Sequence, residues 1–159
     1  MFLTIEPHQY NPQFVMFSEK TKNNVLSGGD FYRIYYSDEE CILNGVHIKL
    51  ALRHITIEKY FNKIKCCFSR KENVDLVEQI KAIEKNILSL TPDLARKHPV
   101  YRIEEQLNND YIKLFTDIVP PFGPAEETIL MLKISGIWAN VNECGLTFRF
   151  FFTRPSGSA

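Results

Sequence analysis

The sequence predicts a mainly β protein with one α-helix in the middle of the chain, folded as a small Greek-key barrel or a curled antiparallel sheet. Aromatic residues make up 13% of the 159 residues, and aromatic side chains are enriched in strands. Apolar and polar residues alternate along 46–53, which is the period of a half-buried strand. A single segment follows the helical spacing of four and three instead, with apolar residues at Leu76, Ile80, Ile83, Ile87 and Leu90.

Short strands account for the first half of the chain. The strand candidates in order are Phe2–Ile5, Phe14–Ser18, Phe31–Ser37, Val46–Arg53, Ile55–Phe61 and Lys63–Phe68. Asn44-Gly45 predicts a hairpin turn before the fourth of them, because Asn-Gly suits the tight turn between two antiparallel strands. The helix then spans roughly Val74–Leu90 with Asn73 as its N-cap, and we expect it to cover one face of the sheet or one open end of a barrel.

The second half of the chain returns to strands. Tyr101–Leu107 is compatible with either a short helix or a strand, and Tyr111–Phe115 is a strand candidate. The clearest hairpin closes the chain, with antiparallel strands at Thr128–Trp138 and Gly145–Thr153. About eight short strands with one helix favour an OB-like barrel with additions. We expect a single OB-like domain over residues 1–155, followed by a linker or expression remnant at residues 156–159.

Composition excludes several classes of protein. The 45% hydrophobic and 24% charged residues are ordinary globular values, and no stretch reaches the ~18 apolar residues of a membrane-spanning helix. The N-terminus lacks the pattern of a signal peptide. The cysteines form no Cys-x-x-Cys pair and the histidines are scattered, so we expect reduced thiols, no metal and no cofactor. The predicted strands are almost free of acidic residues, so neither an enzyme with paired carboxylates nor a small-molecule substrate is expected.

The formal net charge of zero hides an uneven distribution of charge along the chain. Residues 44–71 hold seven basic residues against one acidic residue, and residues 128–159 hold three against one. Residues 1–43 and 72–127 are net acidic. The basic blocks coincide with predicted strands, so a positive potential can gather on one face of a chain that is neutral overall. The alternative is that these Lys and Arg side chains only line the solvent side of strands or protect edge strands.

The period-2 alternation assigns faces to the closing hairpin. The core side of the last strand takes Leu146, Phe148, Phe150 and Phe152. The core side of its partner takes Leu130, Leu132, Ile134 and Trp138. The residues that then point outward include Lys133, Ile137, Arg149 and Phe151.

An exposed aromatic on a basic face suits single-stranded nucleic acid, because every nucleobase offers a π-face for stacking. The candidate phosphate contacts are Lys49, Arg53, Lys63, Lys65, Lys133 and Arg149. The candidate stacking residues are Tyr35, Phe151 and Trp138. For each of these aromatic residues the alternative is that its side chain packs in the hydrophobic core. Trp138, two residues after Gly136, is more typical of a buried side chain that fills the core, which we call a plug.

Two strings of the closing hairpin carry a resemblance to a known family. They are Leu132-Lys133-Ile134-Ser135-Gly136-Ile137-Trp138 and Gly145-Leu146-Thr147-Phe148-Arg149-Phe150. This hairpin resembles the closing hairpin of OB-fold single-stranded-DNA-binding proteins of large DNA viruses and related mobile elements. The resemblance implies an accessory role in replication or recombination, with strand binding in a basic, aromatic groove. It also implies an intracellular location, in the nucleus or a viral replication compartment.

The sequence therefore predicts a sequence-tolerant protein that binds single-stranded nucleic acid, with DNA favoured over RNA, and that can form a homo-oligomer. Two alternatives remain open. One is a protein–protein interaction module of viral or host-interaction type that uses its exposed aromatics, since neutral charge and aromatic side chains suit an interface equally well. The other is a structural β-protein.

Overall fold

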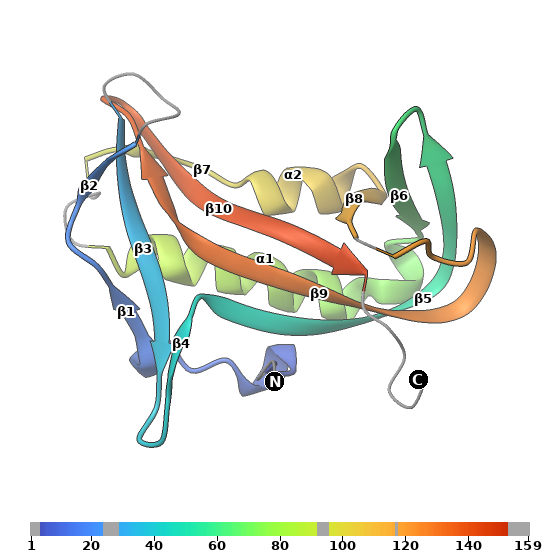
Figure 1. Cartoon of the computed structure of the whole chain (residues 1–159), viewed down its shortest axis with the longest axis horizontal. Helices are drawn as coiled ribbons and strands as arrows, with labels where there is room; N and C mark the ends of the chain where they lie inside the picture. Colours follow the sequence, from blue (N-terminus) through green and yellow to red (C-terminus); the bar gives the residue numbers. More distant parts are fainter. Residues whose placement is uncertain (1–3, 24–28, 92–95, 117, 153–159) are drawn as a thin grey trace.

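Five strands close into a β-barrel with a helix beside it in the computed structural model, which describes residues 4–23, 29–91, 96–116 and 118–152 (Figure 1). The barrel strands are β5 (Val46–Tyr60), β6 (Lys63–Phe68), β8 (Tyr111–Phe115), β9 (Gly123–Ala139) and β10 (Glu143–Phe152). Hydrogen-bonded neighbours follow the closed ring β9–β5–β6–β8–β10–β9. The predicted mainly β class with a mid-chain helix is confirmed.

The order of the strands around the ring differs from their order in the chain. If the barrel strands are numbered one to five along the chain, their order around the ring is one, two, three, five, four. This crossing makes β8 and β10 parallel, while the other barrel pairs are antiparallel. The expectation of an antiparallel sheet is wrong at this pair and at the pairing of β10 with the added strand β7 (His98–Val100), which is also parallel. A closed five-stranded Greek-key barrel is the architecture of an OB-like fold.

Short strands extend the barrel sheet on the side of β9 and β10. The longest addition, β3 (Gly29–Ser37), pairs with β9 through its first half. The other additions are β1 (Val15–Phe17), β2 (Thr21–Asn23), β4 (Ile42–Asn44) and β7 (His98–Val100). Of the strand expected at Phe2–Ile5, Ile5 forms a single bridge to Ile48, and the first three residues lie outside the described residues. The remnant expected at residues 156–159 also lies outside them.

The predicted helix is α1 (Val74–Ser89), which packs its apolar side behind the barrel (Figure 1). Its buried apolar residues are Val77, Ile80, Ile83, Ile87 and Leu88. The ambiguous segment forms a short helix, α2 (Arg102–Asn108), which packs against α1, β8 and β10. Among the described residues, three 3-10 turns complete the elements, at Pro7–Gln9, Pro12–Phe14 and Lys71–Asn73. None of the helices within the described ranges has both the length and the apolar character needed to span a bilayer.

Asn73 occupies the predicted N-cap position of α1, but its side chain does not cap the helix. Its Oδ1 accepts a hydrogen bond from the backbone N–H of Arg53 at 2.8 Å. Its Nδ2 donates to the carbonyl oxygens of Arg53 and Ser69 at 3.0 and 2.8 Å. Because Asn73 is buried, these three bonds join the start of α1 to β5 and to the residue after β6, and they replace water as partners for the backbone groups.

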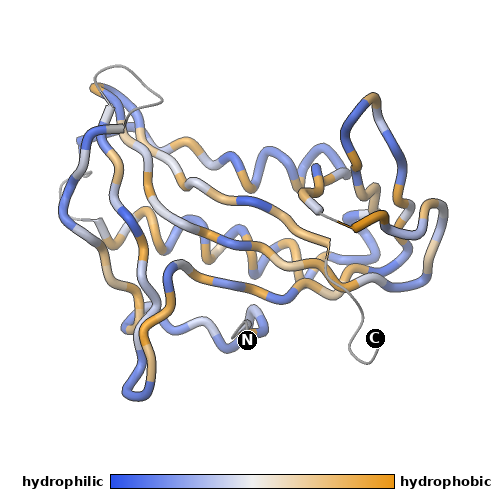
Figure 2. The backbone as a smooth tube through the Cα atoms, in the orientation of Figure 1, coloured by the Kyte–Doolittle hydropathy of each residue, from blue (hydrophilic) through white to orange (hydrophobic). Residues whose placement is uncertain are grey.

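A β-bulge in β9 changes the faces that the sequence predicts for its second half. The registers Phe148–Ile134 and Thr147–Gly136 leave Ser135 as the extra residue. A single extra residue reverses the alternation, so Ile137 is fully buried in the core and Trp138 leaves the face of Leu130, Leu132 and Ile134. The prediction that Trp138 shares that face and that Ile137 points outward is therefore wrong. On β10 the predicted faces hold. Figure 2 shows how hydrophilic and hydrophobic residues are distributed along the strands.

The hairpin predicted at Asn44-Gly45 is also wrong, because β4 pairs with β3 and not with β5. The hairpin turn lies at 38–41, where the Asp38 carboxylate accepts hydrogen bonds from the backbone N–H groups of Glu40 and Cys41 at 2.8 and 2.9 Å. Gly45 has a φ of +101°, and a Cβ there would lie 2.9 Å from the carbonyl oxygen of Ile134. Glycine therefore turns the chain from β4 into the barrel strand β5.

Candidate nucleic-acid interface

The outward side of three neighbouring barrel strands carries alternating basic and aromatic side chains. Because β6, β8 and β10 are adjacent in the ring, their outward positions form one continuous surface. We call this surface the basic-aromatic face, and it consists of Lys63, Lys65, Tyr111, Lys113, Phe115, Arg149 and Phe151. The opposite sides of the same strands carry core residues such as Cys66, Ile112 and Phe150.

Like charges stand directly opposite each other at two places on this surface. Lys65 of β6 is the register partner of Lys113 on β8. Arg149 of β10 is the register partner of Lys133 on the next strand, β9. Like charges at directly opposed positions of two strands destabilise a sheet. Both pairs would be stabilised by an anion that binds between them.

An acidic side chain offsets part of this charge. The Lys65 Nζ lies 3.5 Å from Glu58 Oε2 across the β5–β6 pair, and both side chains are partly exposed. Such an exposed ion pair contributes at most about 1 kcal/mol. Lys113 and Arg149 are exposed and form no ion pair among the described residues. The face is therefore net positive.

The aromatic rings lie among these cations. The Lys65 Nζ lies 5.2 Å from the ring centroid of Tyr60 and 5.5 Å from that of Tyr111. The guanidinium carbon of Arg149 lies 5.1 Å from the centroid of Phe115. Phe115 and Phe151 are tilted neighbours with centroids 6.5 Å apart, and Phe115 is 48% exposed. Rings held in this way offer π-faces to a ligand, with cations beside them that can contact its phosphates.

The structure brings most of the predicted phosphate contacts together. Lys63, Lys65 and Arg149 lie on the basic-aromatic face, and Lys133 lies opposite Arg149 on the next strand. Lys49 lies one strand further on, in β5, where its Nζ is 3.7 Å from Glu6 Oε1. Arg53 is exposed on the same strand and stands opposite Glu127 of β9. These last two positions lie outside the face.

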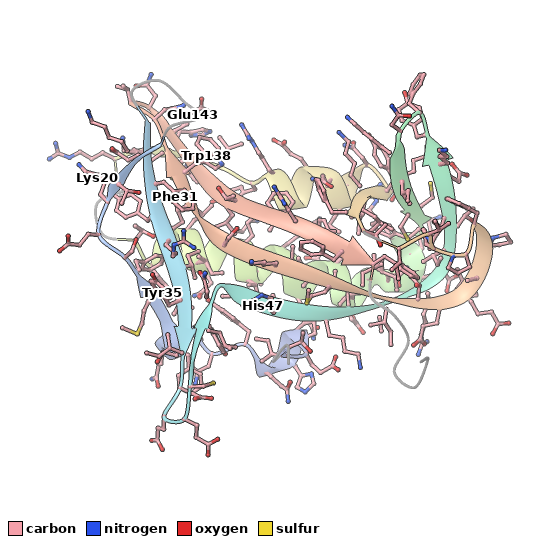
Figure 3. The ribbon with its side chains drawn as sticks, in the orientation of Figure 1. Lys20, Phe31, Tyr35, His47, Trp138 and Glu143 are labelled. Carbon is pink, nitrogen blue, oxygen red and sulfur yellow. The ribbon has the colours of Figure 1, made fainter. Side chains whose placement is uncertain are left out.

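The predicted stacking residues lie in three different environments. Phe151 is half-buried on the basic-aromatic face beside Phe115. Tyr35 is also half-buried, but it lies on the half of β3 that pairs with β1 and β4, outside the barrel (Figure 3). The structure therefore does not bring Tyr35 and Phe151 to one surface.

Trp138 is 7% exposed and sits in the position of a plug. It is the register partner of both Phe31 and Gly145, and Figure 3 shows it beside Phe31. A Cβ on Gly145 would lie 2.6 Å from the indole ring, so glycine is what allows the ring to lie against β10. The Arg102 guanidinium carbon lies 4.6 Å from the indole centroid. No face of the ring is open for stacking in this arrangement.

Four residues of the interface region were missed by the sequence analysis, and all four are aromatic or basic. They are Tyr60, Tyr111, Lys113 and Phe115. The signal was present in β8, because Tyr111, Lys113 and Phe115 alternate with the apolar Ile112 and Leu114. The strand was predicted, but its faces were not assigned. Nothing in the sequence showed that β8 would lie between β6 and β10.

Two further titratable groups of the barrel strands, His47 and Cys66, are buried. His47 stands opposite Lys133, and burial, with a smaller contribution from the Lys133 ammonium, lowers the pKa of His47. Burial raises the pKa of the Cys66 thiol to about 12, and all four cysteines are free. Within the described part of the chain, no group of three or more His, Cys, Asp or Glu side chains is placed to hold a metal ion.

Comparison of the chain with protein-family models, curated proteins and solved structures returned no match. The resemblance of the closing hairpin to viral single-stranded-DNA-binding proteins stays a prediction. The geometry of the basic-aromatic face is the observation from which a function is argued below.

Proposed function

We propose that this protein binds single-stranded nucleic acid, without strong sequence preference, across the basic-aromatic face. The observation that carries the proposal is the two pairs of opposed cations, Lys65–Lys113 and Arg149–Lys133, with the rings of Phe115 and Phe151 next to them along β8 and β10. A phosphate backbone is a ligand whose repeated negative charges suit such pairs. Single strands are favoured over duplex because stacking on an aromatic ring needs an unpaired, accessible base.

Each group has a distinct role in this proposal. The cations that contact phosphates are Lys63, Lys65, Lys113, Lys133 and Arg149. Phe115 and Phe151 stack bases, and Tyr111 lies on the same side of β8 as Phe115, beyond Lys113. Lys49 and Arg53 extend the positive path along β5 for a longer strand. Trp138 is left out of the stacking set because its ring is covered.

The biological role follows from the ligand. A protein that covers single strands acts where duplex DNA is opened, so we propose a role in replication or recombination, in the nucleus or a viral replication compartment. The resemblance of the closing hairpin favours DNA over RNA. A protein distinguishes RNA from DNA through contacts with the 2′-hydroxyl of the ribose. Affinities for DNA and RNA oligonucleotides of the same sequence therefore test the preference for DNA.

A fluorescence anisotropy titration with labelled oligo-dT at several salt concentrations tests the proposal. If about five phosphates are neutralised, log K against log salt has a slope of about −3.5 for a single strand. The absence of binding at low salt would rule the proposal out. Equal affinity for duplex and single strand would contradict the stacking contribution.

Two double variants, one on the face and one away from it, test whether the basic-aromatic face is the binding site. Lys133→Glu with Arg149→Glu reverses two charges at the face and should abolish binding, while circular dichroism shows an intact fold. Lys22→Glu with Lys71→Glu changes the net charge equally at two exposed positions away from the face, on β2 and before α1. This control should keep most of the affinity. Equal loss in both variants would mean that overall charge, and not this face, governs binding.

A further inference from the structure

The tip of the β5–β6 hairpin carries two exposed aromatic residues in succession. Tyr60 and Lys63 form the last pair of the two strands, so Phe61 and Asn62 make the turn. Tyr60 is 55% exposed and Phe61 is 80% exposed. Figure 1 shows this hairpin standing out from one end of the barrel.

Phe61 has a backbone conformation that is unfavourable for a residue with a bulky side chain. Its φ is +54°, in the left-handed region that L-residues with a bulky side chain rarely adopt. A two-residue hairpin turn normally has glycine, asparagine or aspartate at a position with positive φ. The turn therefore stores strain that glycine would relieve.

The contacts of the Phe61 side chain do not offset this backbone strain. The contact recorded for the Phe61 ring is an edge contact with Tyr60, with centroids 4.7 Å apart and ring planes at 76°. With four-fifths of its surface exposed, the side chain buries too little apolar area to stabilise the fold appreciably. Neither the backbone nor the core explains an aromatic residue at this position, so a ligand contact is the remaining physical reason for it.

The tip is continuous with the basic-aromatic face. Lys63 follows the turn directly, and Lys65, two residues further along β6, lies 5.2 Å from the Tyr60 ring centroid. The surroundings of the tip are thus basic, which suits a polyanion. The Tyr60 ring contacts both the Lys65 ammonium and the Phe61 ring, so it links the tip to the basic-aromatic face.

We propose that Phe61, supported by Tyr60, is a wedge that inserts between neighbouring bases and opens the end of a duplex as the freed strand enters the basic-aromatic face. Apolar side chains that insert between base steps unstack them. A rigid turn that already presents the ring loses little conformational freedom on binding. The inference rests on the proposed function and adds to it a strand-separating activity.

The test compares Phe61→Gly with Phe61→Trp in the full chain. The probe is a forked DNA duplex with 2-aminopurine at the junction, whose fluorescence rises when its base is unstacked. Wild type and Phe61→Trp should raise this fluorescence, and Phe61→Gly should not. For oligo-dT, Phe61→Gly should lose about 5- to 150-fold in affinity and keep measurable binding, since one stacking contact is removed and the face remains.

The melting temperature separates a ligand-binding role from a structural one. Phe61→Gly removes the positive-φ strain, so its melting temperature should be equal to or higher than that of wild type. A clearly lower melting temperature would make Phe61 a structural residue and overturn the inference.

The two proposals fail in different ways. If wild type binds oligo-dT and Phe61→Gly still unstacks the junction, the wedge is wrong and the proposed function stands. If wild type shows no oligo-dT binding at low salt, the proposed function is wrong and the wedge falls with it.

Discussion

Lys65 and Lys113 stand directly opposite each other on the outer side of β6 and β8, in register across an antiparallel pair. Arg149 and Lys133 repeat this arrangement across β10 and β9. Each pair destabilises the sheet locally, since like charges are held at neighbouring positions. Positions that reduce stability in this way are typical of binding surfaces, where function opposes stability.

Reversing the charge of Lys113 should therefore change stability and binding in opposite directions. Lys113→Glu places an acidic side chain opposite Lys65, and the free energy of unfolding should rise by about 0.2–1 kcal/mol. Oligo-dT affinity should fall because one phosphate contact becomes repulsive. Denaturant unfolding and an anisotropy titration measure the two effects. A variant that loses stability and keeps its affinity would show that this pair does not serve binding.

Phe151 and Tyr35 should respond differently to truncation. Phe151→Ala removes a ring from the basic-aromatic face and should weaken oligo-dT binding by about 1–3 kcal/mol. Tyr35→Ala acts on the part of β3 outside the barrel and should leave the affinity for a short oligonucleotide unchanged. Thermal melts of both variants show how much of each effect is structural. A larger loss of affinity in Tyr35→Ala would move the interface to β3.

Gly145→Ala tests the role of Trp138 as a plug. The new Cβ would lie 2.6 Å from the indole ring, so the ring or the strand must move, and overpacking of this kind costs about 1–3 kcal/mol. Trp138 is the one tryptophan in the chain, so its emission should shift to longer wavelength as the ring is displaced. Thr147→Ala, at an exposed position on the same strand, is the control and should leave the emission unchanged. An unaltered emission and stability in Gly145→Ala would mean that the indole is not packed against β10.

Glu84 should make the stability of the protein depend on pH. It is fully buried on α1, where its carboxylate accepts hydrogen bonds from the backbone N–H groups of Ile103 and Glu104 at 2.9 and 3.0 Å. Burial raises the pKa of Glu84 to about 7, although these two hydrogen bonds act in the opposite direction.

The sign of the effect follows from proton uptake. Because the folded state holds the proton of Glu84 more tightly than the unfolded chain, this carboxyl contributes less stability as pH rises from about 4.5 to about 7. The decrease amounts to about 3 kcal/mol. Unfolding free energies across this range should fall more steeply for wild type than for Glu84→Gln, which has no titrating group there. Identical pH profiles for the two proteins would contradict the raised pKa.

The elements with a strong local pattern could be predicted from the sequence. The bounds of β8 match the prediction, and α1 differs by one residue at its end, because an apolar stripe and an alternating strand each need only the residues of that segment. The faces of β10 were predicted for the same reason, which placed Arg149 and Phe151 outside. The hairpin at Asn44-Gly45 was wrong because Asp38 provides a better turn, and a local signal does not show which of two turns the strands will use.

The sequence by itself determined that the chain is mainly β with one mid-chain helix, and that its two basic blocks coincide with strands. Only the tertiary structure decided which strands are neighbours. Lys65, Lys113 and Phe151 are far apart in the chain, and they meet because β8 pairs with β6 on one side and with β10 on the other. Such pairing depends on how the barrel closes around one core. The bulge at Ser135 shows the same limit, since one extra residue exchanged the places of Ile137 and Trp138.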